Sequence, residues 1–167
     1  IWVAKGTYFP TDSEDRDISF ELPNGVSIYG GFAGNEVELG QRDWKSNKTI
    51  LSGDIGNTVI LEDNTHRIIS IENSGTLTVL DGFLILNAFN DVPTIEGFGG
   101  GIYIENSKYE IKNCHFETNQ ARRGGGIYIN FNSEGIVDNC SFFENHASVA
   151  LSAAGGAIFD DSEASFI

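Results

Sequence analysis

Positive charge is scarce in this sequence of 167 residues. Lys and Arg together number 10 against 24 Asp and Glu, which gives a formal net charge of −14. Nucleic acids and anionic membrane surfaces attract clustered positive charge, so we expect no nucleic-acid partner. No apolar run approaches the ~20 residues of a membrane-spanning helix, and no secretory signal peptide is visible. We therefore expect no direct membrane insertion of this segment.

Methionine is absent, and cysteine occurs only at Cys114 and Cys140. Two cysteines without a nearby pair of histidines make a poor metal site, so we predict no bound metal and no cofactor. The chain opens on Ile1 inside a strand pattern and stops at Ile167 in the middle of a repeat. We expect it to be part of a longer chain.

Helical periodicity is also missing. No stretch of ten or more residues places apolar side chains at the i, i+3, i+4 and i+7 positions that an amphipathic helix requires. Runs of three to five residues rich in Ile, Tyr, Phe and Val alternate instead with Gly, Asn and Ser. This pattern is typical of short strands separated by turns.

Two sequence motifs recur in the second half of the chain. Gly-Gly-Gly-Ile-Tyr at 99–103 recurs at 124–128 and, as Gly-Gly-Ala-Ile-Phe, at 155–159. The motif at 113–119 recurs at 139–145, and its two cysteines are 26 residues apart (140 − 114). Repeats of this length indicate a stacked, solenoid-like architecture.

The fold that fits is an all-β, right-handed parallel β-helix, in which each coil contains about three strands and returns ~4.8 Å higher. We predict a single domain over 1–167, as an uncapped fragment. Irregular coils with long loops at 33–48 and 88–98 occupy 1–98, and regular coils occupy 99–167.

Equivalent residues should then stack directly on one another. Lys112 should meet Asp138 as an opposite-charge pair, and Asp81 should share one turn position with Asn113 and Asn139. In the loop at 33–48 we expect Trp44 to pack on the helix and Arg42 to pair with Asp43. The residues that the repeat predicts to be structural are Gly100, Gly125, Gly156, Cys114, Cys140, Phe116, Phe142, Asn119 and Asn145.

The stacked cysteines raise the question of a disulfide. Adjacent coils would bring the two Cα atoms to ~4.8 Å, which is inside the disulfide range, but parallel Cβ atoms at the same spacing are slightly too far apart. We favour free, buried thiols, because Gly82 at the expected equivalent position suggests a slot for a small residue.

The combination of Gly-Gly-Ala/Gly-Ile with Phe-x-x-Asn resembles the repeat of chlamydial-type polymorphic outer-membrane proteins. The first half is similar to secreted β-helix repeat proteins of Bacteroidetes-like bacteria. The resemblance implies a bacterial extracellular or cell-surface protein, adhesin-like in some relatives, and supplies no catalytic residues. The matching stretches are 116–119 and 142–145 for the first family, and 1–7, 26–34, 41–44 and 49–54 for the second.

One repeat position suggests binding. Tyr103, Tyr128 and Phe159 lie between inward-facing Ile residues, so they should form an outward aromatic ladder with ~4.8 Å steps. Stacked aromatic rings either form a platform for sugar rings or stabilise the face of the sheet.

Evidence for catalysis is thin. Arg122 and Arg123 lie near Glu117 in sequence, and Asp160-Asp161 follow the third glycine corner, but solvated turns explain both pairs. The histidines are far apart in the repeat. We predict a non-catalytic extracellular or cell-surface module, an adhesin-like stalk or a scaffold that binds glycans or a host or cell-surface protein. A polysaccharide lyase or glycosidase on the same fold is the alternative, and a purely structural spacer is a third possibility.

Overall fold

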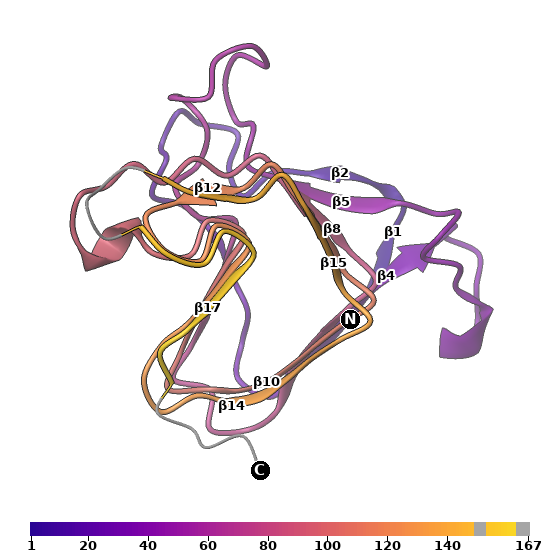
Figure 1. The fold of residues 1–167 in the computed structure, drawn as a ribbon. Helices are drawn as coiled ribbons and strands as arrows, with labels where there is room; N and C mark the ends of the chain where they lie inside the picture. Colours follow the sequence, from indigo (N-terminus) through magenta and orange to yellow (C-terminus); the bar gives the residue numbers. More distant parts are fainter. Residues whose placement is uncertain (149–152, 163–167) are drawn as a thin grey trace.

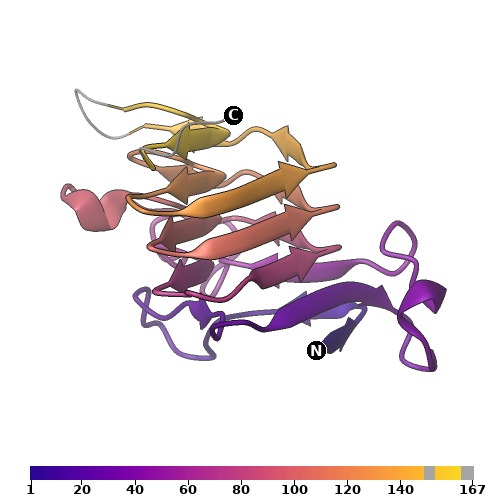
Figure 2. The same ribbon diagram turned by 90° about the horizontal axis from the view of Figure 1, so that it is seen from below.

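A computed structural model describes residues 1–148 and 153–162, and shows a parallel β-helix. Viewed along its axis, the chain winds around a roughly triangular coil (Figure 1). From the side, the strands of successive coils lie one above another (Figure 2). Every pairing between the named strands is parallel, which confirms the all-β solenoid predicted from the repeats.

Three five-stranded sheets form the faces of the helix, and a two-stranded sheet adds a short ledge. The first sheet contains β1 (Trp2–Ala4), β4 (Ser27–Phe32), β7 (Thr78–Asp81), β10 (Lys108–Lys112) and β14 (Glu134–Asp138). The second contains β2 (Gly6–Tyr8), β5 (Thr49–Ser52), β8 (Leu84–Leu86), β11 (His115–Glu117) and β15 (Ser141–Phe143). The third contains β3 (Phe20–Glu21), β6 (Ile69–Glu72), β9 (Ile102–Glu105), β13 (Ile127–Ile129) and β17 (Ile158–Asp160), and the ledge contains β12 (Gln120–Ala121) and β16 (His146–Ala147).

The core consists of like residues stacked from coil to coil. Ile127 pairs in register with Ile102 on one side and Ile158 on the other. The rings of Phe116 and Phe142 stack with centroids 4.8 Å apart and planes 7° apart. Ile102, Phe116 and Ile127 are fully buried. Each such side chain contributes about 1.5–3 kcal/mol relative to exposure, which makes these ladders the main stabilising feature of the fold.

The glycine-rich motifs form a tight corner where neighbouring coils approach each other. A Cβ on Gly100 would lie 2.7 Å from Gly125 O, and one on Gly156 would lie 2.6 Å from Asn145 O. Such separations are shorter than real Cβ contacts, so the corner has room only for glycine at these levels.

The register of the earlier coils differs from the prediction by one residue. Asp81 pairs with Lys112, not with Asn113. The turn position of Asn113 and Asn139, which have φ values of +52° and +50°, is taken in the preceding coil by Gly82 with φ +87°. Glycine and asparagine tolerate this left-handed backbone best, so the conformation of the turn, and not the spacing of the polar residues, sets the register.

The cysteines stack as the repeat requires, and both are free thiols, but only Cys114 is buried as predicted, whereas Cys140 is half-buried. The shifted register places Cys114 level with Phe83, so the proposed equivalence with Gly82 was wrong. The Cys114 thiol donates to Lys112 O at 3.2 Å, and that of Cys140 donates to Asp138 O at 3.3 Å.

The basic residues of two predicted ion pairs contact other carboxylates in the structure. Lys112 lies beside Asp138 in the register, but its ammonium contacts Glu110 on its own strand at 2.7 Å. Arg42 does not pair with Asp43; its guanidinium contacts Asp81 at 2.7 Å. Lys112 and Glu110 are two residues apart on one strand, so their side chains lie on the same side of the sheet. Arg42 contacts Asp81 instead of Asp43 because Asp81 is buried and Asp43 is exposed to water.

Three loops leave the coils. The segment 33–48 carries a short 3-10 helix, η1 (Leu39–Gln41), and packs the backbone of Trp44 against Gly31, where a Cβ would lie 2.5 Å from Trp44 Cα. A second 3-10 helix, η2 (Ile95–Gly97), lies before β9, and the loop between β5 and β6 projects from the coils (Figure 1). In the described residues, no helix has the length and apolar character needed to cross a bilayer.

Candidate functional site

The aromatic ladder at the third sheet is regular but covered. Tyr128 stacks between Tyr103 and Phe159 with ring centroids 5.6 Å apart on each side, and the planes are nearly parallel. Phe98 lies against Tyr128 at 4.8 Å, and the Arg67 guanidinium lies 4.0 Å above the Tyr103 ring. Tyr103 is 8% and Tyr128 2% exposed. The ladder therefore offers no broad ring face to a ligand in this structure.

The tyrosine hydroxyls of the ladder are held within the protein. Asn130 Nδ2 donates to Tyr103 Oη at 2.8 Å, and the Tyr128 hydroxyl donates to Asp161 Oδ2 at 3.2 Å. Burial, together with the charge of Asp161, raises the pKa of Tyr128 to about 12. Burial likewise raises the pKa of Tyr103. These contacts give the ladder a stabilising role in the sheet face.

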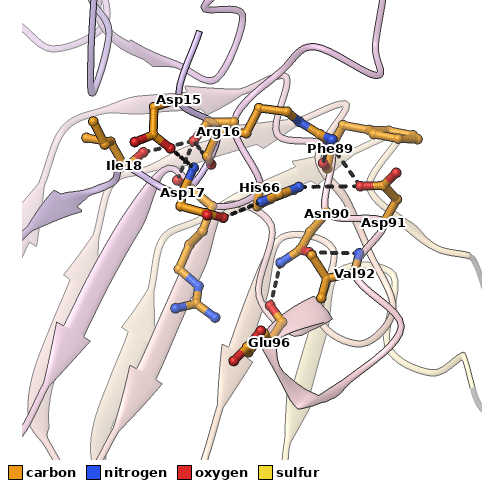
Figure 3. A network of polar contacts seen from close by, with 12 residues as sticks. Asp15, Arg16, Asp17, Ile18, His66, Phe89, Asn90, Asp91, Val92 and Glu96 are labelled. Atoms are coloured by element: carbon orange, nitrogen blue, oxygen red, sulfur yellow. Dashed lines mark hydrogen bonds and ion pairs between the residues drawn. The ribbon is translucent and has the colours of Figure 1, made fainter. Parts of the chain in front are cut away.

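A polar pocket lies beside the ladder and is the candidate functional site. It has a volume of ≈ 310 Å³. It joins the loop before β3, the segment leading into β6 and the loop around η2, which the fold brings together at one corner (Figure 3). Its lining residues are Asp17, Ser19, His66, Arg67, Asn90, Val92 and Glu96.

His66 is at the centre of the contacts in this pocket. Its Nδ1 lies 2.8 Å from Asp17 Oδ1, and its Nε2 lies 3.5 Å from Asp91 Oδ1 (Figure 3). The side chain of His66 is 19% exposed, whereas that of Asp17 is 86% exposed at the rim. Both imidazole nitrogens thus face carboxylates, which fixes the ring in one orientation.

Arg16 ties this arrangement to the backbone of two neighbouring segments. Its guanidinium donates to Asp91 Oδ1 at 3.0 Å, to Phe89 O at 2.7 Å and to Asn64 O at 2.7 Å. Charge-assisted bonds of this kind are roughly twice as strong as neutral ones. The pocket is consequently held by interactions between segments far apart in sequence.

Arg67 forms the inner wall of the pocket. Its Nη2 donates to Phe98 O at 3.0 Å, and its Nη1 lies 3.7 Å from Glu72 Oε1. Burial lowers the pKa of Arg67, an effect that the charge of Glu72 opposes. Arginine titrates so far above neutrality that the side chain stays charged. Its Nε is buried and has no hydrogen-bond partner among the described residues.

The wall opposite is made by the loop at 88–98. Asn90 is fully buried; its Nδ2 donates to Glu96 O at 2.9 Å and its Oδ1 accepts from Val92 N at 3.4 Å. These bonds fold the loop over η2 and turn Glu96 toward the pocket. The lining therefore contains both donor and acceptor side chains, as a hydroxyl-rich ligand requires.

The other residues singled out from sequence do not form a common site. Arg123 lies 5.1 Å from the ring centroids of both Phe98 and Phe159, so it covers the aromatic ladder. Asp160 pairs in register with Ile129 at the last described coil. His115 contacts Ser141 and Glu117 on an outer face. In residues 1–148 and 153–162, no group of three or more His, Cys, Asp or Glu side chains is placed to hold a metal ion.

Sequence analysis did not identify the His66 pocket. His66 lies 49 residues from Asp17, and no repeat relates these positions. The only available signal was that polar residues interrupt the coils on both sides of His66, in the segments 10–17 and 87–91.

These features define a solenoid protein with parallel coils and a polar pocket at a loop-covered corner. The family described as "Right handed beta helix region" matches residues 39–165. The chain belongs to this family, and the match confirms the right-handed parallel β-helix. Searches found no matching curated protein and no matching solved structure.

Proposed function

We propose that the chain is a non-catalytic β-helix module that binds glycans at the His66 pocket, in a protein that acts outside the cell or at its surface. Sugar hydroxyls both donate and accept hydrogen bonds. The pocket offers Arg67 as donor and the carboxylates of Asp17 and Glu96 as acceptors, in a volume at the lower end of small-ligand sites. The stacked coils supply a stiff support, as an adhesin-like stalk would require.

The observation that carries this proposal is that carboxylates flank His66 on both sides, with Asp17 hydrogen-bonded to Nδ1 and Asp91 3.5 Å from Nε2. A general base needs a nitrogen within reach of the proton that it removes. Here Asp17 and Asp91 hold the ring from both sides, so the imidazole is fixed as a wall of the pocket. This arrangement favours binding over proton transfer.

A carbohydrate-active enzyme is the second candidate, and one observation favours it. Asp17 and Glu96 line the same pocket as Arg67, so two carboxylates and a cation share one cavity. Lyases and glycosidases use acid and base groups placed around a sugar in this way.

Calorimetric titration with a panel of neutral and acidic oligosaccharides tests the first proposal. We expect Asp17→Ala to weaken binding about tenfold or more, because a charge-assisted hydrogen bond is lost. Glu14→Ala is the matched control, since Glu14 is an exposed acid of the same loop that does not line the pocket. Equal losses in both variants, or no binding by the wild type, would contradict the proposal.

The same oligosaccharides distinguish the enzyme. New reducing or unsaturated ends released by the wild type, and lost in Glu96→Gln, would support the second candidate. Binding without product release would support the first.

A further inference from the structure

The loop between β5 and β6, residues 53–65, closes at its base. Thr65 N donates to Gly53 O at 2.8 Å, which brings the two ends of the loop together. Asp54 follows Gly53, and Asn64 precedes Thr65, so both lie beside this closing bond. We call this base the loop neck.

Asp63 also turns toward the neck. Its Oδ2 accepts from Asn57 N at 2.8 Å, and a Cβ on Gly56 would overlap the same carboxylate. Gly56 lies two residues after Asp54. Two carboxylates from opposite ends of the loop therefore approach the same short stretch of backbone.

Each of three neck residues has one buried side-chain oxygen without a hydrogen-bond partner. They are Asp54 Oδ1, Asp63 Oδ1 and Asn64 Oδ1. Within residues 1–148 and 153–162, no other buried carboxylate or amide oxygen lacks a partner. Buried polar atoms in native proteins are almost always paired, and an unpaired group indicates a bound ion or water. Three such oxygens lie in this one loop, two of them on carboxylates.

Asn64 provides evidence that does not depend on the acidic residues. It is 2% exposed, and its Nδ2 donates to Asn87 O at 2.8 Å. That carbonyl oxygen lies 2.6 Å from where a Cβ on Gly53 would be. The Asn64 amide is thus held against the Gly53 end of the neck, next to Asp54, while its oxygen has no donor.

The charge of the neck is not neutralised within the protein. The ion pairs of the described residues include neither Asp54 nor Asp63. Burial and then the charge of Asp63 raise the pKa of Asp54, in agreement with two carboxylates held close together. A cation would relieve this repulsion and satisfy the oxygens at the same time.

We propose that the loop neck binds a calcium ion through Asp54, Asp63 and Asn64, with backbone carbonyls and water completing the coordination. Calcium takes six to eight oxygen ligands in flexible geometry, whereas thiolate and imidazole suit transition metals. A groove of ≈ 720 Å³, lined in part by Asp12, Asp54 and Gly56, gives the ion a path from solvent. With two carboxylates, we expect affinity on the order of 10⁻⁴–10⁻³ M. The ion would fix the loop to the coils, independently of glycan binding.

Calorimetric titration of chelator-treated protein with CaCl2, and thermal unfolding at about 10 mM CaCl2 against EDTA, test this site. We expect one ion per chain and a rise in Tm of about 3–5 °C, because binding to the folded state alone stabilises it. Asp54→Asn and Asp63→Asn should each weaken binding at least tenfold and reduce the rise to half or less of that of the wild type. Since either change removes repulsion, the calcium-free Tm of both variants should be at or above that of the wild type.

Glu62→Gln is the matched control, because Glu62 is an exposed acid of the same loop with no buried unpaired oxygen. It should keep the calcium response of the wild type. No heat and no Tm shift in the wild type would overturn the site. A loss in Glu62→Gln as large as that in Asp54→Asn would also overturn it, because the effect would then be general charge screening.

Discussion

Asn119 shows what a single polar residue does inside this core. It is fully buried, and its Nδ2 donates to Ile85 O and to Asn145 Oδ1, each at 2.9 Å. Its Oδ1 accepts from Ala88 N at 3.1 Å. One side chain thus satisfies backbone groups of the coil below and the amide of the coil above, which explains why the position requires both a donor and an acceptor.

Asn119→Ala should therefore lower the free energy of unfolding by about 1–3 kcal/mol, because it removes the side-chain partner of two backbone groups in the core, Ile85 O and Ala88 N. Denaturant unfolding monitored by circular dichroism measures the loss. Asn35→Ala is the control, since Asn35 is exposed, and should stay within about 0.5 kcal/mol of the wild type. A loss at position 119 no larger than that control would show that water satisfies the two backbone groups.

At the scale of the element, the glycine corner determines how closely two coils approach. A Cβ on Gly125 would lie 2.5 Å from His146 O and 2.7 Å from Gly156 O. These are backbone atoms of the neighbouring coil, so the contact cannot be relieved by turning a side chain. The glycines of the corner therefore determine the distance between neighbouring coils.

We predict that Gly125→Ala lowers the free energy of unfolding by about 1–3 kcal/mol, as overpacking does elsewhere. Thermal unfolding of the variant measures the change. Gly40→Ala provides the comparison, because a Cβ at Gly40 would have no atom within 4 Å. A Gly125→Ala protein as stable as Gly40→Ala would mean that adjacent coils separate without cost.

At the scale of the whole molecule, the stack carries a net charge of −14. Its ion pairs are local, such as Arg42 with Asp81 in the core of one corner and Lys112 with Glu110 on an outer face. Most of the negative charge is distributed over loops and turns. Like charges so arranged destabilise the compact state by mutual repulsion.

We accordingly expect NaCl to stabilise the folded chain. Raising ionic strength from about 0.01 M to 0.15 M shortens the Debye length from roughly 30 Å to 8 Å, so repulsion between exposed carboxylates weakens and Tm rises. Scanning calorimetry in the presence of EDTA measures this effect apart from any calcium response. A Tm that falls with added NaCl would instead show that attractive ion pairs dominate.

The class of fold and the register of the later coils follow from the amino-acid sequence alone. The motif at 113–119 recurs 26 residues later. In parallel strands this offset stacks Phe116 with Phe142 and Asn119 with Asn145. The physical reason is that a repeat of like residues is most favourable when equivalent positions form continuous ladders.

The register of the earlier coils and the candidate sites depend on contacts that form when the chain folds. Gly82, not Asp81, takes the left-handed turn, because backbone conformation outweighs the spacing of polar residues. The covering of the aromatic ladder by Phe98 and Arg67 depends on how a loop folds back. His66 meets Asp17 and Asp91 because loops of different coils converge at one corner, and no periodic pattern encodes contacts between loops of unequal length.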